Sequence, residues 1–149
     1  MVSEHNARHL VPPDLDGVVL ARRAVDAMGL RGPLTGAVKL VVSELVTNSV
    51  EHAGLGPEDQ IQVHTALDGR GALHVEVCDP GPGPAPDATR GMGWSVLECV
   101  ADRWGIDRRG GLTRVWFEFD PPPAGGENGG SPGPPSPERP SRGLGPAHR

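Results

Sequence analysis

The sequence has no tyrosine and only five aromatic residues, three Trp and two Phe. Proteins that bind single-stranded nucleic acids stack the bases on aromatic side chains, and this chain has few to offer. Residues 1–120 also carry 11 Lys and Arg against 17 Asp and Glu, a net charge of −6. Because nonspecific nucleic-acid binding needs a basic surface, composition argues against a direct nucleic-acid partner.

Long apolar runs are absent as well. The longest run, Val18–Ala21, is far shorter than the roughly 20 residues needed to span a bilayer, and no secretory signal follows Met1. The two cysteines, Cys78 and Cys99, are too few for a disulfide framework, and no Cys-x-x-Cys metal pair exists. We therefore expect a cytoplasmic protein with reduced thiols and no membrane contact.

Glycine and proline are concentrated at the C-terminal end. Residues 121–149 contain 7 Gly and 9 Pro among 29 positions. Such a segment cannot bury enough apolar surface to offset the entropy lost on ordering, so we expect a disordered tail. The remainder, residues 1–120, has the size of one domain.

Hydrophobic spacing predicts an α+β domain. Residues 1–6 are expected to be frayed. Helices are predicted over about 15–28, 33–53 and 93–103, and strands over 7–11, 61–67, 72–78, 104–108 and 112–119. The order β-α-α-β-β-α-β-β favours a mixed sheet with its helices on one face.

A polar stripe runs along the second predicted helix. Glu44, Asn48 and His52 are spaced i, i+4 and i+8, which places them on one helix face. This face is either the solvent side of the helix or a site of metal and phosphate chemistry. An Asn oxygen suits Mg²⁺, and a Glu one turn away can accept a proton from a hydroxyl. We interpret His52, near the helix end, as a structural hydrogen-bonding residue.

The second motif, Asp79-Pro-Gly81-Pro-Gly83, ends a predicted buried strand. An Asp in that place is costly unless it is paired, and its carboxylate could accept a hydrogen bond from the exocyclic amine of a purine. Gly81 and Gly83 would let the backbone pass close to a ligand. An ordinary strand-ending turn would have the same composition.

The third motif, Gly91-Met-Gly93, precedes the third predicted helix. Free amides and the positive end of the helix dipole favour an anion there, although a plain turn with a helix cap is the alternative. The motif is not a Walker loop, because no Gly-Lys-Ser/Thr follows, and it lacks the third glycine of a dinucleotide fingerprint. A fourth candidate, Thr113, begins an apolar strand, where Thr is also common for its β-propensity.

These motifs, in this order, resemble the GHKL ATPase superfamily, which includes gyrase, the heat-shock chaperone of ninety kilodaltons, histidine kinases and MutL. The segments Val42–Asn48, Ala101–Gly105 and Val115–Glu118 look most like its small branch of anti-sigma-factor serine/threonine kinases. The resemblance covers roughly residues 8–120. It implies a Bergerat-type two-layer α/β sandwich, with a mixed, mostly antiparallel sheet, that binds ATP and Mg²⁺ between helices and sheet.

The resemblance also implies roles for individual residues. Glu44 matches the proposed general base, Asn48 the Mg²⁺ ligand and Thr113 a residue that supports adenine through water. The adenine-binding and phosphate-binding positions correspond to Asp79, Gly81, Gly83, Gly91 and Gly93. Arg90, the only cation between Pro84 and Arg90, is a candidate contact for the γ-phosphate. Trp94 departs from the usual Leu and would either narrow the pocket or pack beneath it.

The function implied is transfer of the ATP γ-phosphate to a Ser or Thr of an anti-anti-sigma partner, with a sigma factor as a further partner and a homodimer as a possible state. An alternative is a nucleotide-binding module that sequesters its partner without phosphotransfer. A detached histidine-kinase catalytic domain would need a phosphoacceptor helix hairpin before the domain. An ATP-driven clamp would need a transducer domain after it. Neither is expected from this sequence.

Overall fold

The computed structural model of the chain describes residues 3–82, 92–122 and 143–144. Its elements in chain order are β1 (His5–Val11), α1 (Leu15–Asp26), α2 (Pro33–His52), β2 (Ile61–Leu67), β3 (Leu73–Asp79), α3 (Met92–Val100), β4 (Arg103–Arg109), β5 (Leu112–Phe119) and β6 (Gly143–Leu144). The predicted α+β order is therefore confirmed through β5.

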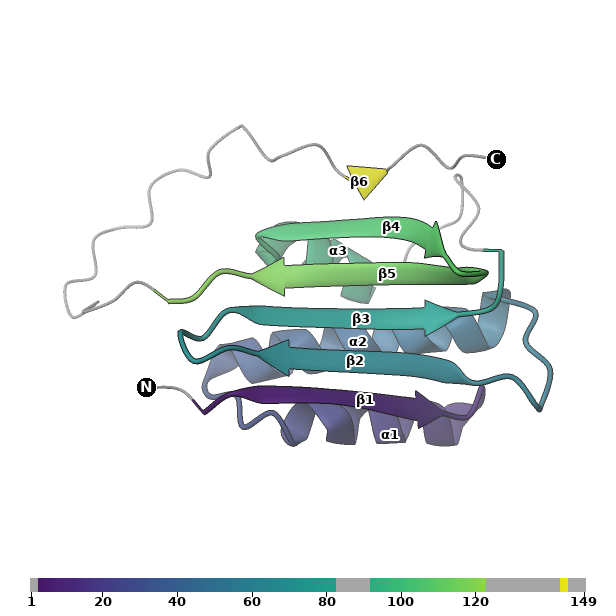
Figure 1. Cartoon of the computed structure of the whole chain (residues 1–149), viewed down its shortest axis with the longest axis horizontal. Helices are drawn as coiled ribbons and strands as arrows, with labels where there is room; N and C mark the ends of the chain where they lie inside the picture. The colour runs from purple at the N-terminus through teal and green to yellow at the C-terminus, as the bar shows by residue number, and fades with distance from the viewer. Residues whose placement is uncertain (1–2, 83–91, 123–142, 145–149) are drawn as a thin grey trace.

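The strands form one sheet in the order β1-β2-β3-β5-β4-β6 (Figure 1). Strands β1 to β5 pair antiparallel throughout, and the only parallel pairing among the described residues joins β4 to β6. The sheet is thus mixed but mostly antiparallel, as predicted. The short β6 lies in the predicted tail; residues 123–142 and 145–149 are outside the described part, so disorder there stays a prediction.

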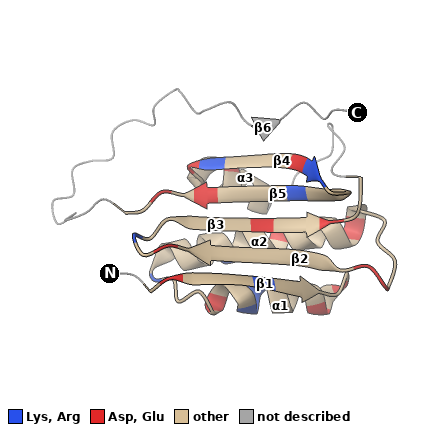
Figure 2. Ribbon diagram, in the orientation of Figure 1, with Lys and Arg blue, Asp and Glu red and all other residues tan. Residues whose placement is uncertain are grey.

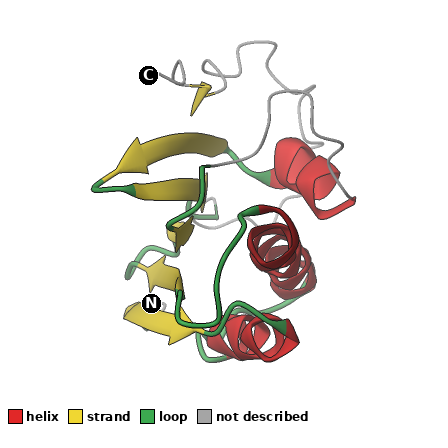
Figure 3. Cartoon of the chain, turned by 90° about the vertical axis from the view of Figure 1, so that its right-hand side faces the viewer, coloured by secondary structure: helices red, strands yellow, loops and turns green. Residues whose placement is uncertain are grey.

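All three helices cover the same face of the sheet, which gives two layers (Figure 3). The core between the layers is mostly aliphatic, with Val38, Val41, Val42 and Val46 of α2 fully buried. Each such side chain contributes roughly 1.5–3 kcal/mol through removal of apolar surface from water. The small aliphatic stripe lets α2 lie flat along the centre of the sheet.

Strand β3 shows how the sheet divides its side chains. Successive residues of a strand point to opposite faces. Leu73, Val75, Val77 and Asp79 are buried toward the helices, whereas the alternate positions on the outer face carry the partly buried His74 and Glu76 and the buried Cys78. Several charged residues of β3, β4 and β5 are visible in the same view of the sheet (Figure 2).

The helix ends follow the sequence signals. Asp14 caps α1, since its side chain accepts a hydrogen bond from the Gly17 amide at 3.2 Å; such a cap is worth about 1 kcal/mol. Gly29 and Gly54 follow α1 and α2 with φ of 70° and 67°, a left-handed conformation that glycine adopts without strain. Pro33 occupies the first turn of α2, as predicted.

Most boundaries differ from the prediction by one to three residues. Strand β1 begins at His5 instead of Ala7, because His5 pairs with Leu67 and its Nε2 lies 2.9 Å from the Thr65 hydroxyl. Helix α3 ends at Val100, and β4 begins at Arg103 because Arg103 pairs with Glu118 of β5. None of the helices in the described residues has both the length and the apolar character needed to cross a membrane.

Candidate functional site

A buried carboxylate lies where β3 ends beneath α2. Asp79 is 8% exposed. Its Oδ2 accepts a 2.5 Å hydrogen bond from the Ser49 hydroxyl of α2, and its Oδ1 accepts one of 2.7 Å from the Gly81 amide. A carboxylate offers about four acceptor positions. Asp79 is therefore held in place from two sides while still able to accept a hydrogen bond from an added amine.

The neighbouring strand completes this cluster. Thr113 of β5 lies directly opposite Asp79 in the β3–β5 ladder and is 3% exposed. Its hydroxyl donates to the Gly81 carbonyl at 2.6 Å. Arg108 of β4 donates to the same carbonyl at 2.8 Å and to the Thr113 hydroxyl at 2.9 Å. The turn after β3 is thus fixed through Gly81 to the adjacent strand β5 and to β4 beyond it.

Sequence reasoning missed Ser49 and Arg108, although each left a signal. Ser49 occupies a position of the buried stripe of α2 that is otherwise filled by Val and Leu. A polar side chain buried in such a stripe needs a partner, and Asp79 is that partner. Arg108 lies two residues after Ile106 on β4 and therefore on the same face of the strand. It pairs with Thr113 of β5, so both side chains lie on the helix side of the sheet.

Two motif glycines lie within the described residues, and both make close contacts: Gly93 with α2 and Gly81 with Ala53, the C-cap residue of α2. A Cβ at Gly81 would lie 2.6 Å from the Cβ of Ala53, and a Cβ at Gly93 would lie 2.3 Å from the Cβ of Glu44. Distances under 3.0 Å are not tolerated without movement of a neighbour. Both glycines are therefore required by the close approach of another element, and Gly93 brings the start of α3 against Glu44.

Asn48 lies between these two contacts along α2. It comes one turn after Glu44 and one residue before Ser49, and both Glu44 and Asn48 are half-buried. His52, at the end of α2, has a side chain that is 70% exposed, with its Nε2 3.6 Å from a Glu51 carboxylate oxygen. The stripe therefore runs from the Gly93 contact past Asp79 to solvent at His52.

Trp94 packs into the core. It is 3% exposed, its ring meets Trp104 edge-on with centroids 5.5 Å apart, and its Nε1 donates to Glu98 at 2.8 Å. Its burial agrees with packing, one of the two alternatives expected for this side chain; its effect on a nucleotide pocket stays a prediction. The Trp94 ring, which is larger than the usual Leu, thus packs α3 against β4.

Three predicted site residues, Gly83, Arg90 and Gly91, lie outside the described residues. The structure therefore brings together Asp79, Gly81 and Thr113 in one cluster and Glu44 with Gly93 in another. Asn48 lies between them on the same helix. The described side chains of these clusters offer carboxylate, amide and hydroxyl oxygens, which can accept hydrogen bonds and protons.

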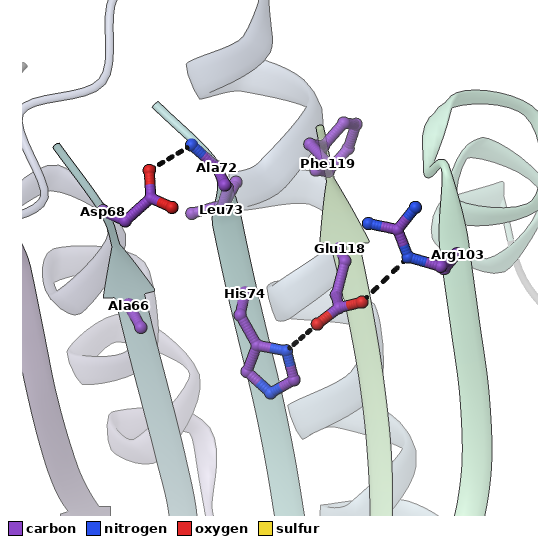
Figure 4. A pocket seen from close by; sticks show the side chains of 8 residues that line it. All are labelled: Ala66, Asp68, Ala72, Leu73, His74, Arg103, Glu118 and Phe119. Carbon is purple, nitrogen blue, oxygen red and sulfur yellow. Dashed lines mark hydrogen bonds and ion pairs between the residues drawn. The ribbon is translucent and has the colours of Figure 1, made fainter. Parts of the chain in front are cut away.

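A cavity of about 250 Å³ opens at the opposite end of the sheet (Figure 4). It is lined by Ala66, Asp68, Ala72, Leu73, His74, Arg103, Glu118 and Phe119. Leu73 and Asp79 are the two ends of β3, so this cavity lies roughly 20 Å from Asp79 at about 3.4 Å per residue. None of the predicted site residues lines it.

Comparison with known proteins gives matches in family and fold. A family model described as histidine kinase-like ATPase domain matches residues 11–119. A similar solved structure is that of the RsbU and RsbW domains of Rv1364c from Mycobacterium tuberculosis, with a TM-score of 0.60 and 19% identity over 76% of this chain and 32% of that one. This chain thus spans about a third of that protein's length.

A second similar structure is the histidine kinase domain of a blue-light activated histidine kinase from Erythrobacter litoralis EL346, with a TM-score of 0.49 and 20% identity over 69% of this chain and 58% of that one. No curated protein sequence matches. At such identities the likeness to solved structures concerns the fold alone.

Proposed function

Because the chain belongs to the histidine kinase-like ATPase domain family, we propose that it binds Mg-ATP beside α2 and α3 and transfers the γ-phosphate to a Ser or Thr of an anti-anti-sigma protein. The observation that carries this proposal is the buried Asp79 carboxylate, which Ser49 and the Gly81 amide hold at the end of β3. A fixed, desolvated acceptor in that place suits the exocyclic amine of adenine.

The adenine half of the proposed site fits the residues present. Asp79 accepts the amine hydrogen bond, and Gly81, which packs against Ala53, holds the turn beside the proposed base. Thr113 supports both, since its hydroxyl fixes the Gly81 carbonyl at 2.6 Å. A buried acceptor that is already aligned costs little reorganisation when the ligand arrives. Gly83 keeps its proposed place beside the base.

The phosphate half lies where α3 meets α2. Asn48 supplies a side-chain oxygen of the kind that Mg²⁺ prefers, and Glu44 lies one helical turn away. Gly93 brings the first turn of α3, at the positive end of its helix dipole, against Glu44. Gly91 and Arg90 are proposed phosphate contacts on the segment before α3. When bound, Mg-ATP supplies the γ-phosphoryl group and the metal offsets its charge.

Glu44 is the proposed general base. Its carboxylate takes the proton of the partner's Ser or Thr hydroxyl as the oxygen bonds to phosphorus and ADP leaves. Glu44 is half-buried, which leaves part of the residue accessible to a partner. The partner class rests on the resemblance of Val42–Asn48 and neighbouring segments to anti-sigma-factor kinases. A sigma factor is a further proposed partner, in the cytoplasm, with a homodimer as one possible state.

ATP binding is tested by calorimetry on the full chain with Mg-ATP. The variant Asp79→Asn keeps an acceptor for the Gly81 amide, and its new NH₂ can donate to Ser49, so it should fold. It presents a donor to the adenine amine and should weaken ATP binding by at least about tenfold, which corresponds to 1.4 kcal/mol. Asp68→Asn, at the opposite end of the β2–β3 hairpin, is the matched control and should bind normally. Equal affinities in both variants would overturn the adenine assignment.

Phosphotransfer is tested separately with γ-labelled ATP and a pull-down of partners identified by mass spectrometry. Wild type should label a captured partner on Ser or Thr. Glu44→Gln should retain ATP binding and lose most of the labelling, because the amide cannot accept the proton. A partner that is captured but never labelled by wild type would support the sequestering module instead.

A further inference from the structure

The outer face of the sheet, away from α2 and α3, carries a cluster of two histidines and one glutamate. His64 of β2 pairs with Glu76 of β3 across the ladder, and His74 lies two residues before Glu76 on β3. One ligand atom from each of the three lies within 4.8 Å of the others. The side chains are mostly buried, with 13%, 26% and 13% exposure for His64, His74 and Glu76.

His64 is oriented with an unused nitrogen toward this cluster. Its Nε2 lies 2.9 Å from the Asn6 side-chain oxygen, so this nitrogen carries the hydrogen and donates it. Nδ1 of the neutral ring then carries a lone pair and no hydrogen. It is buried, has no hydrogen-bond partner, and lies 3.9 Å from Oε2 of Glu76. A lone pair that faces a carboxylate oxygen in a buried place is unfavourable unless a cation lies between them.

His74 has the complementary arrangement. Its Nδ1 lies 2.8 Å from Oε2 of Glu118 (Figure 4), and Arg103 holds the other oxygen of Glu118 at 3.0 Å. A carboxylate on one ring nitrogen is the usual arrangement that orients a metal-binding histidine. Nε2 of His74 points to Oε1 of Glu76 at 2.8 Å, so a metal ion would displace the hydrogen shared there.

We propose that His64 Nδ1, His74 Nε2 and a Glu76 oxygen bind one divalent transition-metal ion of the zinc class. Two imidazoles and one carboxylate suit zinc, and three protein ligands leave a fourth position for water. Ligand atoms around zinc are roughly 3.3 Å apart in a tetrahedron with bonds of about 2.05 Å. The observed spacings are 2.8 Å from His74 Nε2 to Oε1 of Glu76 and 3.9 Å from His64 Nδ1 to Oε2, so a side-chain rotation must bring one Glu76 oxygen to an ion shared with both rings.

The surrounding charges allow a cation here. Three carboxylates lie in or beside the cluster: Glu76, Glu118 and Asp107. Arg114 donates to Glu76 at 2.6 Å and to Asp107 at 2.7 Å. Arg103 and Arg8 complete the neighbourhood, Arg8 opposite His64 in the β1–β2 ladder. Arg114 also fixes Oε1 of Glu76 and leaves Oε2 directed at His64.

The test is calorimetric titration of the full, nucleotide-free chain with Zn²⁺, together with the absorption of bound Co²⁺ as a probe of coordination. We expect one ion per chain and a raised Tm that a chelator reverses. His64→Gln removes a ligand and should weaken Zn²⁺ binding at least about a hundredfold, beyond the roughly 10–100-fold that the loss of a supporting contact costs. Glu118→Gln, a positioning change, should weaken binding without removing a ligand. Folding of each variant is checked by circular dichroism.

His52→Gln is the matched control, because His52 is an exposed histidine near a Glu but outside the cluster. It should leave Zn²⁺ affinity unchanged. The proposal is overturned if His64→Gln binds Zn²⁺ as tightly as wild type, or if His52→Gln loses as much affinity as His64→Gln. Mg-ATP affinity should be the same in wild type and His64→Gln, which separates this site from the nucleotide site on the other face.

Discussion

Gly93 of α3 lies so close to Glu44 of α2 that a Cβ at Gly93 would come within 2.3 Å of the Glu44 Cβ and 3.1 Å of the Leu40 carbonyl oxygen. Gly93 is absent from the glycines with positive φ. Contact with α2 therefore requires glycine here, and the backbone conformation does not. Two motifs that are distant in the sequence meet at this contact.

The first prediction concerns this contact. Gly93→Ala should push α3 away from α2 and destabilise the fold by about 1–3 kcal/mol, as overpacking does. It should also weaken ATP binding. Gly36→Ala is the matched control, because Gly36 lies in α2 with nothing within 4 Å of an added Cβ. That change should stabilise by about 0.5–1 kcal/mol. Urea unfolding measures both, and equal stabilities would contradict the close contact.

The second prediction separates the site threonine from a structural one. Thr113→Val removes the hydroxyl that joins Gly81 to Arg108, at a cost of about 1 kcal/mol. Thr65→Val removes a buried strand hydroxyl that meets His5 instead. We expect similar losses of stability in urea, but weaker ATP binding only in Thr113→Val. Reduced ATP affinity in both variants would indicate a general effect of destabilisation.

The third prediction concerns the two free thiols. Cys78 is buried and Cys99 is exposed. Burial, together with the nearby Glu76 carboxylate, raises the pKa of Cys78 to about 11, and the thiolate is the reactive form. At pH 8 iodoacetamide should therefore modify one thiol of the native chain, and peptide mapping should locate it at Cys99. Modification of both at equal rates would contradict the burial of Cys78.

The fourth prediction is a pH dependence in the β2–β3 turn. The Asp68 carboxylate accepts hydrogen bonds from the Ala72 and Arg70 amides, both at 2.9 Å. The Ala72 amide is the main reason that the pKa of Asp68 is lowered from 3.8. Because the folded state holds the ionised form, its stabilising effect is present above 3.8 and is lost as pH falls through the lower folded value.

The measurement is Tm between pH 7 and pH 2 for wild type and Asp68→Asn. Wild type should be more stable at pH 7, and the difference should shrink only below the ordinary pKa of Asp. A difference that persists unchanged at the lowest pH would mean that the ionised carboxylate contributes nothing to the turn.

Much of the fold was accessible from the sequence because its signals are local. Asp14, Pro33 and Gly54 mark helix ends, and the alternation in residues 61–67 marks β2. The start of β1 at His5 was not accessible. It depends on pairing with Leu67, a contact between segments far apart in the chain. The short pairing of Gly143–Leu144 with β4 has the same origin.

The candidate site likewise has residues that the sequence could predict and residues that it could not. Its motif residues were named from order and spacing, but their partners were not. Ser49 reaches Asp79 only because α2 crosses above the end of β3, and Arg108 reaches Gly81 only because β4 pairs with β5. Such partners depend on tertiary packing, which spacing along one element does not encode.

Strand β3 carries Asp79 on its helix side and His74 and Glu76 on its outer side. Only an even number of residues can therefore be gained or lost between Glu76 and Asp79 if both faces are to keep their side chains. A single inserted residue in that stretch would turn Asp79 outward, away from Ser49. The helix-side residue Asp79 and the outer-face residues His74 and Glu76 therefore both constrain the length of this segment of β3.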